Sequence, residues 1–209
     1  GCGKSTTARL MLRLLDPTAP GLDAKLADRF DRPTAVRAVS TRVAALTAAL
    51  VASGVRRGGV CIVPALASAA TLDAIVGAGL RPWLVDVDPC SWMFDPAHLR
   101  ERLGEAPPPI EAIVPTCAFG RAPDMTAWAA FQRETGLPIV VDATDGFDVV
   151  MEAPVPVIVG LPSGRGVFVA SQDADFIARL DAPAFSGEAG LDDWSGQRLR
   201  LATAAQRLR

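Results

Sequence analysis

Asp142 is the side chain best placed to do chemistry, because it directly follows the apolar, β-branched run Ile139-Val140-Val141. A carboxylate at the end of such a run is half buried, and it needs a cation or hydrogen-bond donors as partners. In open parallel sheets ligands bind outside the carboxyl ends of the strands, so a bound group is expected at this place. Judged by its position alone, Asp142 could equally be a residue that only caps the turn that follows.

Side chains that could act as nucleophiles, bases or metal ligands are scarce in this sequence. The only lysines are Lys4 and Lys25, and the only histidine is His98, which we interpret as an exposed helix residue. The four cysteines lie far apart without a C-x-x-C pair, so we predict neither a metal site nor a disulfide framework. Free cysteines favour a reducing, cytoplasmic location.

Composition and charge indicate a soluble globular protein. Of the 209 residues, 50% are hydrophobic, and 21 Lys+Arg against 23 Asp+Glu give a formal net charge of -2. This balance provides no broad basic field for nucleic acid. The longest stretch without a charged side chain, 58–72, is short and is broken by Pro64, so we expect no membrane span.

The elements that would position Asp142 follow from hydrophobic patterning. Apolar, β-branched runs predict buried strands, and apolar residues at helical spacing predict helices between them. The strands are predicted at 60–65, 81–87, 112–119, 138–144, 155–160 and 166–171, and the helices at 43–53, 67–77, 96–103, 124–134 and 173–180. Continuous apolar strands that alternate with helices predict an α/β fold, with a mainly parallel sheet covered by helices on both faces.

Several segments, in order, carry a resemblance to a known family. They are Val63-Pro-Ala-Leu through Val85-Asp-Val-Asp-Pro, Ile113-Val-Pro with Phe119-Gly and Asp124-Met, Gly136-Leu-Pro-Ile-Val-Val-Asp-Ala, and Gly196-Gln-Arg-Leu-Arg-Leu. Together they resemble the large domain of the DegT/DnrJ family of sugar aminotransferases, which are fold-type I enzymes. The likeness implies pyridoxal phosphate as cofactor, nucleotide-sugar and amino-acid donor ligands, and a homodimer. It covers residues 21–209, so we expect the C-terminal small domain to be missing.

The resemblance also implies roles for individual residues. Asp142 matches the aspartate that pairs with the pyridine nitrogen of the cofactor, which keeps the ring protonated as an electron sink. Thr41 and Arg42 fall on the stretch that holds the cofactor phosphate. Asp145 falls on a family glutamine or histidine near the cofactor, and Ser68 falls on the aromatic residue that stacks on the ring. Because a serine cannot stack, we expect cofactor binding to be weak or lost.

The lysine that forms the Schiff base in the family has no counterpart here. The sequence Gly160-Leu-Pro-Ser-Gly-Arg-Gly-Val runs directly through the place where the resemblance puts it, and no lysine follows Lys25. Without that amine we expect ordinary transamination to fail, and we assign no catalytic residue. The chain is therefore expected to be a catalytically impaired family member, or else a noncatalytic partner subunit of an active paralogue.

A different function, nucleotide binding, is indicated by the start of the sequence. Gly1-Cys-Gly-Lys-Ser-Thr-Thr resembles the second half of a phosphate-binding P-loop, which would make residues 1–20 a helical P-loop remnant or a junction. The first glycine and the preceding strand of such a loop are absent from this sequence. We therefore expect Gly1–Thr6 not to bind ATP. The sequence also lacks an initiator methionine, so we expect the chain to be cut from something longer.

Overall fold

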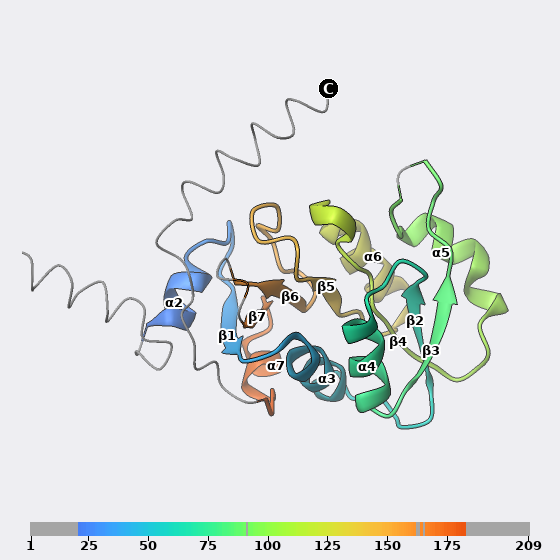
Figure 1. Ribbon diagram of the computed structural model, residues 1–209, viewed down its shortest axis with the longest axis horizontal. Coiled ribbons are helices and arrows are strands. Elements are labelled where there is room, and N and C mark those ends of the chain that lie inside the picture. The colour runs from blue at the N-terminus through green and yellow to red at the C-terminus, as the bar shows by residue number, and fades with distance from the viewer. Residues whose placement is uncertain (1–20, 91, 162–163, 165, 183–209) are drawn as a thin grey trace, which may run out of the picture.

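The computed structural model describes residues 21–90, 92–161, 164 and 166–182 (Figure 1). The strands in this part are β1 (Ala35–Val39), β2 (Val60–Pro64), β3 (Arg81–Val85), β4 (Ile110–Ile113), β5 (Val141–Ala143), β6 (Val157–Gly160) and β7 (Val167–Ser171). The helices are α2 (Leu22–Ala27), α3 (Arg42–Ala52), α4 (Ala69–Gly77), α5 (Pro96–Arg102), α6 (Met125–Thr135) and α7 (Ala174–Ala178), with short 3-10 turns at Leu103–Glu105 and Ala118–Gly120. From β2 onward, helices separate most consecutive strands, as the sequence predicted.

The strands form one mainly parallel sheet. Two groups, β3-β2-β4 and β5-β6-β7-β1, are joined by parallel bridges between Ile113 and Ile139 and between Thr116 and Asp142. The order across the sheet is therefore β3-β2-β4-β5-β6-β7-β1. Of the described strands, β7 alone runs in the direction opposite to the others, and it pairs antiparallel with β6 and β1. This arrangement confirms the predicted α/β fold class.

Helices cover both faces of the sheet. One core cluster contains side chains of α2, α5 and α6, and the other contains side chains of α3, α4 and α7. Strand residues alternate between the clusters: Val157 and Val159 belong to the first, and Ile158 belongs to the second. Figure 1 shows α3, α4 and α7 together on one side of the sheet. The continuous apolar strands thus reflect burial on both faces.

Two strand predictions need correction. β1 was not predicted at all, although it pairs with β7 along its whole length. The predicted strand 112–119 instead lies at Ile110–Ile113, and beyond it only Thr116 makes an isolated bridge. Pro115 has no N–H to donate to the ladder, and Phe119 adopts a left-handed backbone with φ 54°, so the chain cannot stay in the sheet.

Two further features concern the same described residues. None of their helices is long and apolar enough to cross a membrane. Within those ranges no group of three or more histidine, cysteine and acidic side chains could hold a metal ion. The P-loop-like Gly1–Thr6, the rest of segment 1–20 and the family-like stretch at 196–209 lie outside the described residues.

Candidate functional site

The site is built on Asp142, the middle residue of β5. This strand is interior, because β6 pairs with it on one side and the bridges to the β4 segment lie on the other. The neighbours Val141 and Ala143 point into the core cluster beneath α6, so Asp142 points to the opposite face, toward α3 and α4. Asp142 is only 2% exposed. The structure thus places it near the carboxyl end of an interior strand, as predicted.

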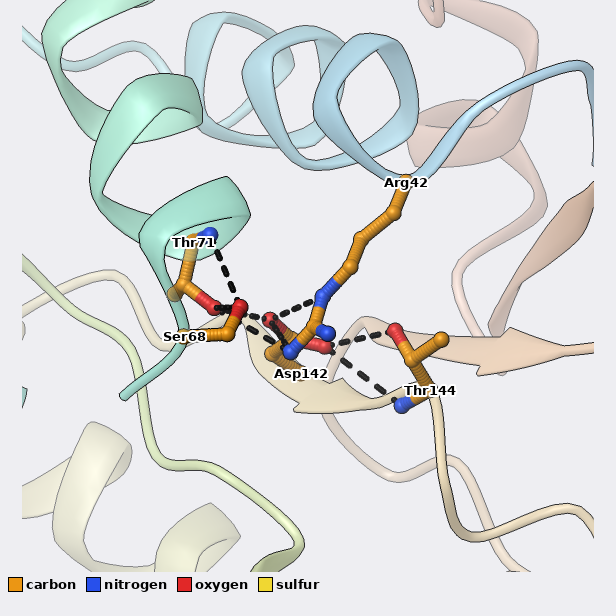
Figure 2. A network of polar contacts seen from close by, with 5 residues as sticks. All are labelled: Arg42, Ser68, Thr71, Asp142 and Thr144. Carbon is orange, nitrogen blue, oxygen red and sulfur yellow. Dashed lines mark hydrogen bonds and ion pairs between the residues drawn. The ribbon is translucent and has the colours of Figure 1, made fainter. Parts of the chain in front are cut away.

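Arg42 supplies the charge partner of Asp142. It is the first residue of α3, and its guanidinium contacts Asp142 Oδ2 through Nη2 at 2.7 Å and through Nε at 3.0 Å (Figure 2). The Asp142 side chain is fully buried, whereas the Arg42 side chain is 22% exposed. Charge-assisted hydrogen bonds of this length are the strong ones in proteins. The carboxylate is therefore held as an ion pair on the inside of the fold.

Thr71 connects Asp142 to α4. Its hydroxyl donates to Asp142 Oδ2 at 2.7 Å and accepts from Arg42 Nη2 at 3.1 Å, and the residue is fully buried. Ser68 Oγ lies 3.0 Å from Thr71 Oγ1 and also accepts from the Thr71 amide at 3.2 Å. The sequence analysis did not assign Thr71. The only available signal was its place three residues after Ser68, where a helix cap and its partner occur.

Thr144 completes the set of donors around Asp142. Its hydroxyl donates to Asp142 Oδ1 at 2.8 Å and its amide points to the same oxygen at 3.4 Å. Gly160 of the neighbouring strand donates its amide to the Thr144 carbonyl, and a Cβ at Gly160 would overlap that carbonyl oxygen. Close packing of β6 thus fixes the turn that carries Thr144. Sequence reasoning did not assign Thr144 either.

The other predicted site residues serve local structure. Thr41 is exposed and caps α3, because its hydroxyl accepts from the Ala44 amide at 3.2 Å. Ser68 caps α4 in the same way, and it reaches the site only through Thr71. Asp145 is exposed, and within the described part of the chain it forms no hydrogen bond or ion pair with Asp142. The structure brings together Arg42, Asp142 and Ser68, and leaves Thr41 and Asp145 at the rim.

Cys117 brings a thiol close to this site, because its amide donates to the Asp142 carbonyl at 2.9 Å. Burial raises the pKa of Cys117 to about 12, and the negative charges of Asp145 and Asp142 act in the same direction. The thiol also donates to the Arg121 carbonyl at 2.8 Å. Only a thiolate is a good nucleophile, so Cys117 stays protonated and inert near neutral pH.

Comparison with protein families identifies the fold and its relatives. A model of the DegT/DnrJ/EryC1/StrS aminotransferase family matches residues 15–153, more than half of the chain. This chain belongs to that family. An L-glutamine:scyllo-inosose aminotransferase of Streptomyces griseus is 36% identical over 104 residues, which are 50% of this chain and 24% of that protein. A pleiotropic regulatory protein of Geobacillus stearothermophilus is 36% identical over 99 residues, 47% of this chain and 26% of the relative. The match therefore spans about a quarter of these relatives.

Solved structures of the family have the same fold. An aminotransferase of Brucella abortus superposes with a TM-score of 0.67 at 23% identity, covering 83% of this chain and 55% of that one. The structure of 3-amino-5-hydroxybenzoic acid synthase gives 0.67 at 22% identity, covering 84% of this chain and 49% of that one. At these identities the likeness establishes the fold alone.

The cofactor that the family implies, pyridoxal phosphate, does not fit this site as it stands. An ionised carboxylate offers about four lone-pair positions in total. Arg42 and Thr71 already contact Oδ2, and Thr144 contacts Oδ1 with both its hydroxyl and its amide. A pyridinium N–H would have to displace one of these donors. Ser68 offers no ring to stack on, and its hydroxyl is engaged by α4.

Proposed function

We propose that this chain is a sugar-aminotransferase-family domain that does not itself catalyse transamination. The observation that carries the proposal is the turn between β6 and β7, where the family resemblance places the Schiff-base lysine. Leu161 N donates to the Gly166 carbonyl at 3.2 Å and Gly164 N donates to the Leu161 carbonyl at 2.9 Å, and residues 160–167 contain no lysine. These two hydrogen bonds join the described residues Leu161, Gly164 and Gly166, and the sequence of this segment offers no amine for covalent capture of an aldehyde.

The remaining lysine of the described part cannot substitute for the missing one. Lys25 is exposed on α2, which packs against β1. β1 and β5 are the two outer members of the sheet group β1-β7-β6-β5 (Figure 1). Lys25, on the helix that packs against β1, and Asp142, on β5, therefore belong to opposite edges of that group. An arginine in the turn, Arg165, cannot act instead, because its guanidinium stays protonated and is a poor nucleophile.

Borohydride trapping tests the first part of this proposal. The protein is incubated with pyridoxal phosphate, reduced and mapped by peptide mass, with Lys25→Arg as the control variant. In parallel, amino transfer is assayed from L-glutamine or L-glutamate to scyllo-inosose, the acceptor named for the Streptomyces griseus relative. We expect no stoichiometric label and no transfer. Stoichiometric labelling of one lysine, or measurable transfer, would show that the chain is an enzyme after all.

We further propose that the domain acts by association, as a noncatalytic subunit that binds a second copy of itself. Trp92 and Phe119 support this role: they are 53% and 72% exposed, and their ring centroids lie 5.5 Å apart. Both residues also have left-handed backbones and follow β3 and β4 on the side of their carboxyl ends. Exposed aromatic side chains are enriched in protein interfaces. One relative is named a regulatory protein rather than an enzyme, which agrees with a nonenzymatic role.

Light scattering at micromolar concentration tests the association. We expect a dimer for the native chain and a monomer for the double variant Trp92→Ser/Phe119→Ser. Val51→Ser is a matched control, because Val51 is 58% exposed on α3 and lies outside the aromatic pair. A native monomer, or a dimer that survives the double variant, would refute this interface. Binding only to an active paralogue would count as refutation of self-association.

A further inference from the structure

We propose that Arg42 takes the place of a cofactor cation against Asp142, so that the chain carries a permanent internal counter-charge where the family holds a dissociable pyridinium. The inference deepens the proposed function. It rests on that proposal only in treating the chain as a domain of the aminotransferase family. It concerns noncovalent binding, so it does not depend on whether any lysine reacts. The two ideas can therefore fail separately.

The first step is the position of Arg42 in its helix. Arg42 opens α3, and the first turn of α3 holds no acidic residue. The partial positive charge of a helix N-terminus disfavours a cation there. Asp142 belongs to a strand 100 residues further along the chain, and its Oδ2 lies 2.7 Å from Arg42 Nη2. Its negative charge compensates both the guanidinium and the positive end of the helix. The arginine at this unfavourable place is thus explained by the distant carboxylate.

The second step is that one side chain joins two ends of the expected cofactor site. The resemblance puts Arg42 in the stretch that holds the cofactor phosphate, and it puts Asp142 at the ring nitrogen. Figure 2 shows the Arg42 side chain extending from α3 down to the carboxylate. The guanidinium therefore lies in the space between the two ends. A phosphorylated pyridine ring and the Arg42 side chain cannot both occupy it.

The third step is that Thr71, on α4, holds both Arg42 and Asp142 in place. Thr71 is fully buried, donates to the same carboxylate oxygen and accepts from Arg42 Nη2. Any cation that replaced Arg42 would have to leave the Thr71 contact intact and expel a guanidinium that is mostly covered. The apparent affinity of such a ligand is its intrinsic affinity multiplied by the fraction of time that Asp142 is free of Arg42.

Removal of Arg42 should therefore create a binding site. Arg42→Ser frees Asp142 and introduces a hydroxyl beside Thr41, at the N-terminus of α3. The probe is pyridoxine 5′-phosphate, which has no aldehyde and cannot react covalently with Lys4 or Lys25. We expect no saturable fluorescence change with the native chain, and saturable binding to Arg42→Ser with an affinity higher by more than about ten-fold.

Two variants make this titration specific. Arg56→Ser removes an arginine from a different carboxylate, Glu111, at the amino ends of the strands, and it should behave like the native chain. Arg42→Ser/Asp142→Asn should lose the binding gained by Arg42→Ser. Native binding within about two-fold of the Arg42→Ser value, or a folded Arg42→Ser that binds nothing, would overturn the inference.

A second measurement covers the case in which Arg42→Ser does not fold. In the native chain, the Arg42 Nε–H signal in nitrogen-15 NMR should exchange slowly with water, because Nε donates to Asp142 at 3.0 Å. This signal should remain unchanged at the highest concentration of pyridoxine 5′-phosphate used in the titration, and it should broaden in Asp142→Asn. A rapidly exchanging signal, or one displaced by the probe, would show that Arg42 does not hold the site.

Discussion

The Arg42–Asp142 pair and the Arg56–Glu111 pair share a shortest nitrogen–oxygen distance of 2.7 Å, yet they lie at opposite ends of the strands. Glu111 is near the start of β4, and Asp142 is near the end of β5. The arginine side chain is 22% exposed in the first pair and 80% exposed in the second. Equal contact distances therefore coexist with very different access to water.

Burial decides what each pair contributes. Water screens the Arg56 guanidinium, although the Glu111 side chain is only 8% exposed, so this pair is open to solvent through its arginine. Water does not reach the Asp142 side chain. Its negative charge is therefore stabilised by Arg42 and by the hydroxyls of Thr71 and Thr144. The same chemical pair thus reaches solvent through its arginine at one end of the sheet, and it is largely enclosed at the centre of the site at the other.

Replacement of Arg42 by alanine should have the largest effect on stability. It leaves a buried carboxylate without its cation, and we expect the free energy of unfolding to fall by about 3 kcal/mol. Urea denaturation measures this loss, with Arg56→Ala as the matched control. The control should lose clearly less stability. Equal losses in the two variants would contradict the role of burial.

Replacement of Thr71 by valine should come next. The shapes are nearly the same, but the buried carboxylate loses a donor at 2.7 Å, so we expect a loss of about 1–3 kcal/mol. Thr47→Val is the control, because Thr47 is only half buried and its hydroxyl donates to the Ala74 carbonyl at 3.2 Å. Calorimetry measures the stability of both variants. An equal loss of stability in the control would count against the Asp142 network.

The contribution of the Arg56–Glu111 pair should depend on pH. Hydrogen bonding to Arg56 lowers the pKa of Glu111 below its ordinary value. The folded state therefore favours the ionised form, and the stabilisation is complete above the unfolded pKa of about 4.3 and is lost as the pH falls through the folded pKa. The stability difference between the native chain and Glu111→Gln should be constant from pH 6 to 8 and shrink below about pH 5. A difference that grows toward acid pH would invert this assignment.

The smallest effect is expected for Arg100 and Glu134, which bridge α5 and α6. Their contact is 2.5 Å long, but the two side chains are 43% and 52% exposed. Solvent and salt screen such a pair almost completely. A double-mutant cycle with Arg100→Gln and Glu134→Gln should give no coupling beyond experimental error, and raised salt should not change it. A coupling as large as the stability loss measured for Arg42→Ala would show that contact distance, not burial, sets the energy.

Most of the fold could be predicted from hydrophobic patterning, and the exceptions have local causes. Val60–Pro64 and Val167–Ser171 are continuously buried, so their apolar runs identify them. β1 was missed because it is a short edge strand with Arg37 at its centre. The Arg37 guanidinium donates to the Leu180 carbonyl, a contact between segments 143 residues apart. No local pattern contains that partner.

The site was predictable only in part. Asp142 stood out because a carboxylate after an apolar run must find a partner. The sequence did not identify that partner: Arg42 was expected near the cofactor phosphate, and the structure shows it in contact with Asp142. An arginine at the start of an apolar helix with no nearby acid was the available signal. Thr71 could not be identified, since its role depends on the packing of α4 over β5.

The double use of Ser68 has a consequence for local unfolding. Its hydroxyl caps α4 by accepting from the Thr71 amide, and it also lies against the Thr71 hydroxyl that reaches Asp142. Fraying of the first turn of α4 must therefore disturb the buried carboxylate. Helix ends usually exchange their amide hydrogens quickly, by openings that cost little free energy. Here the Thr71 amide should exchange in step with the interior of β5, as one cooperative unit.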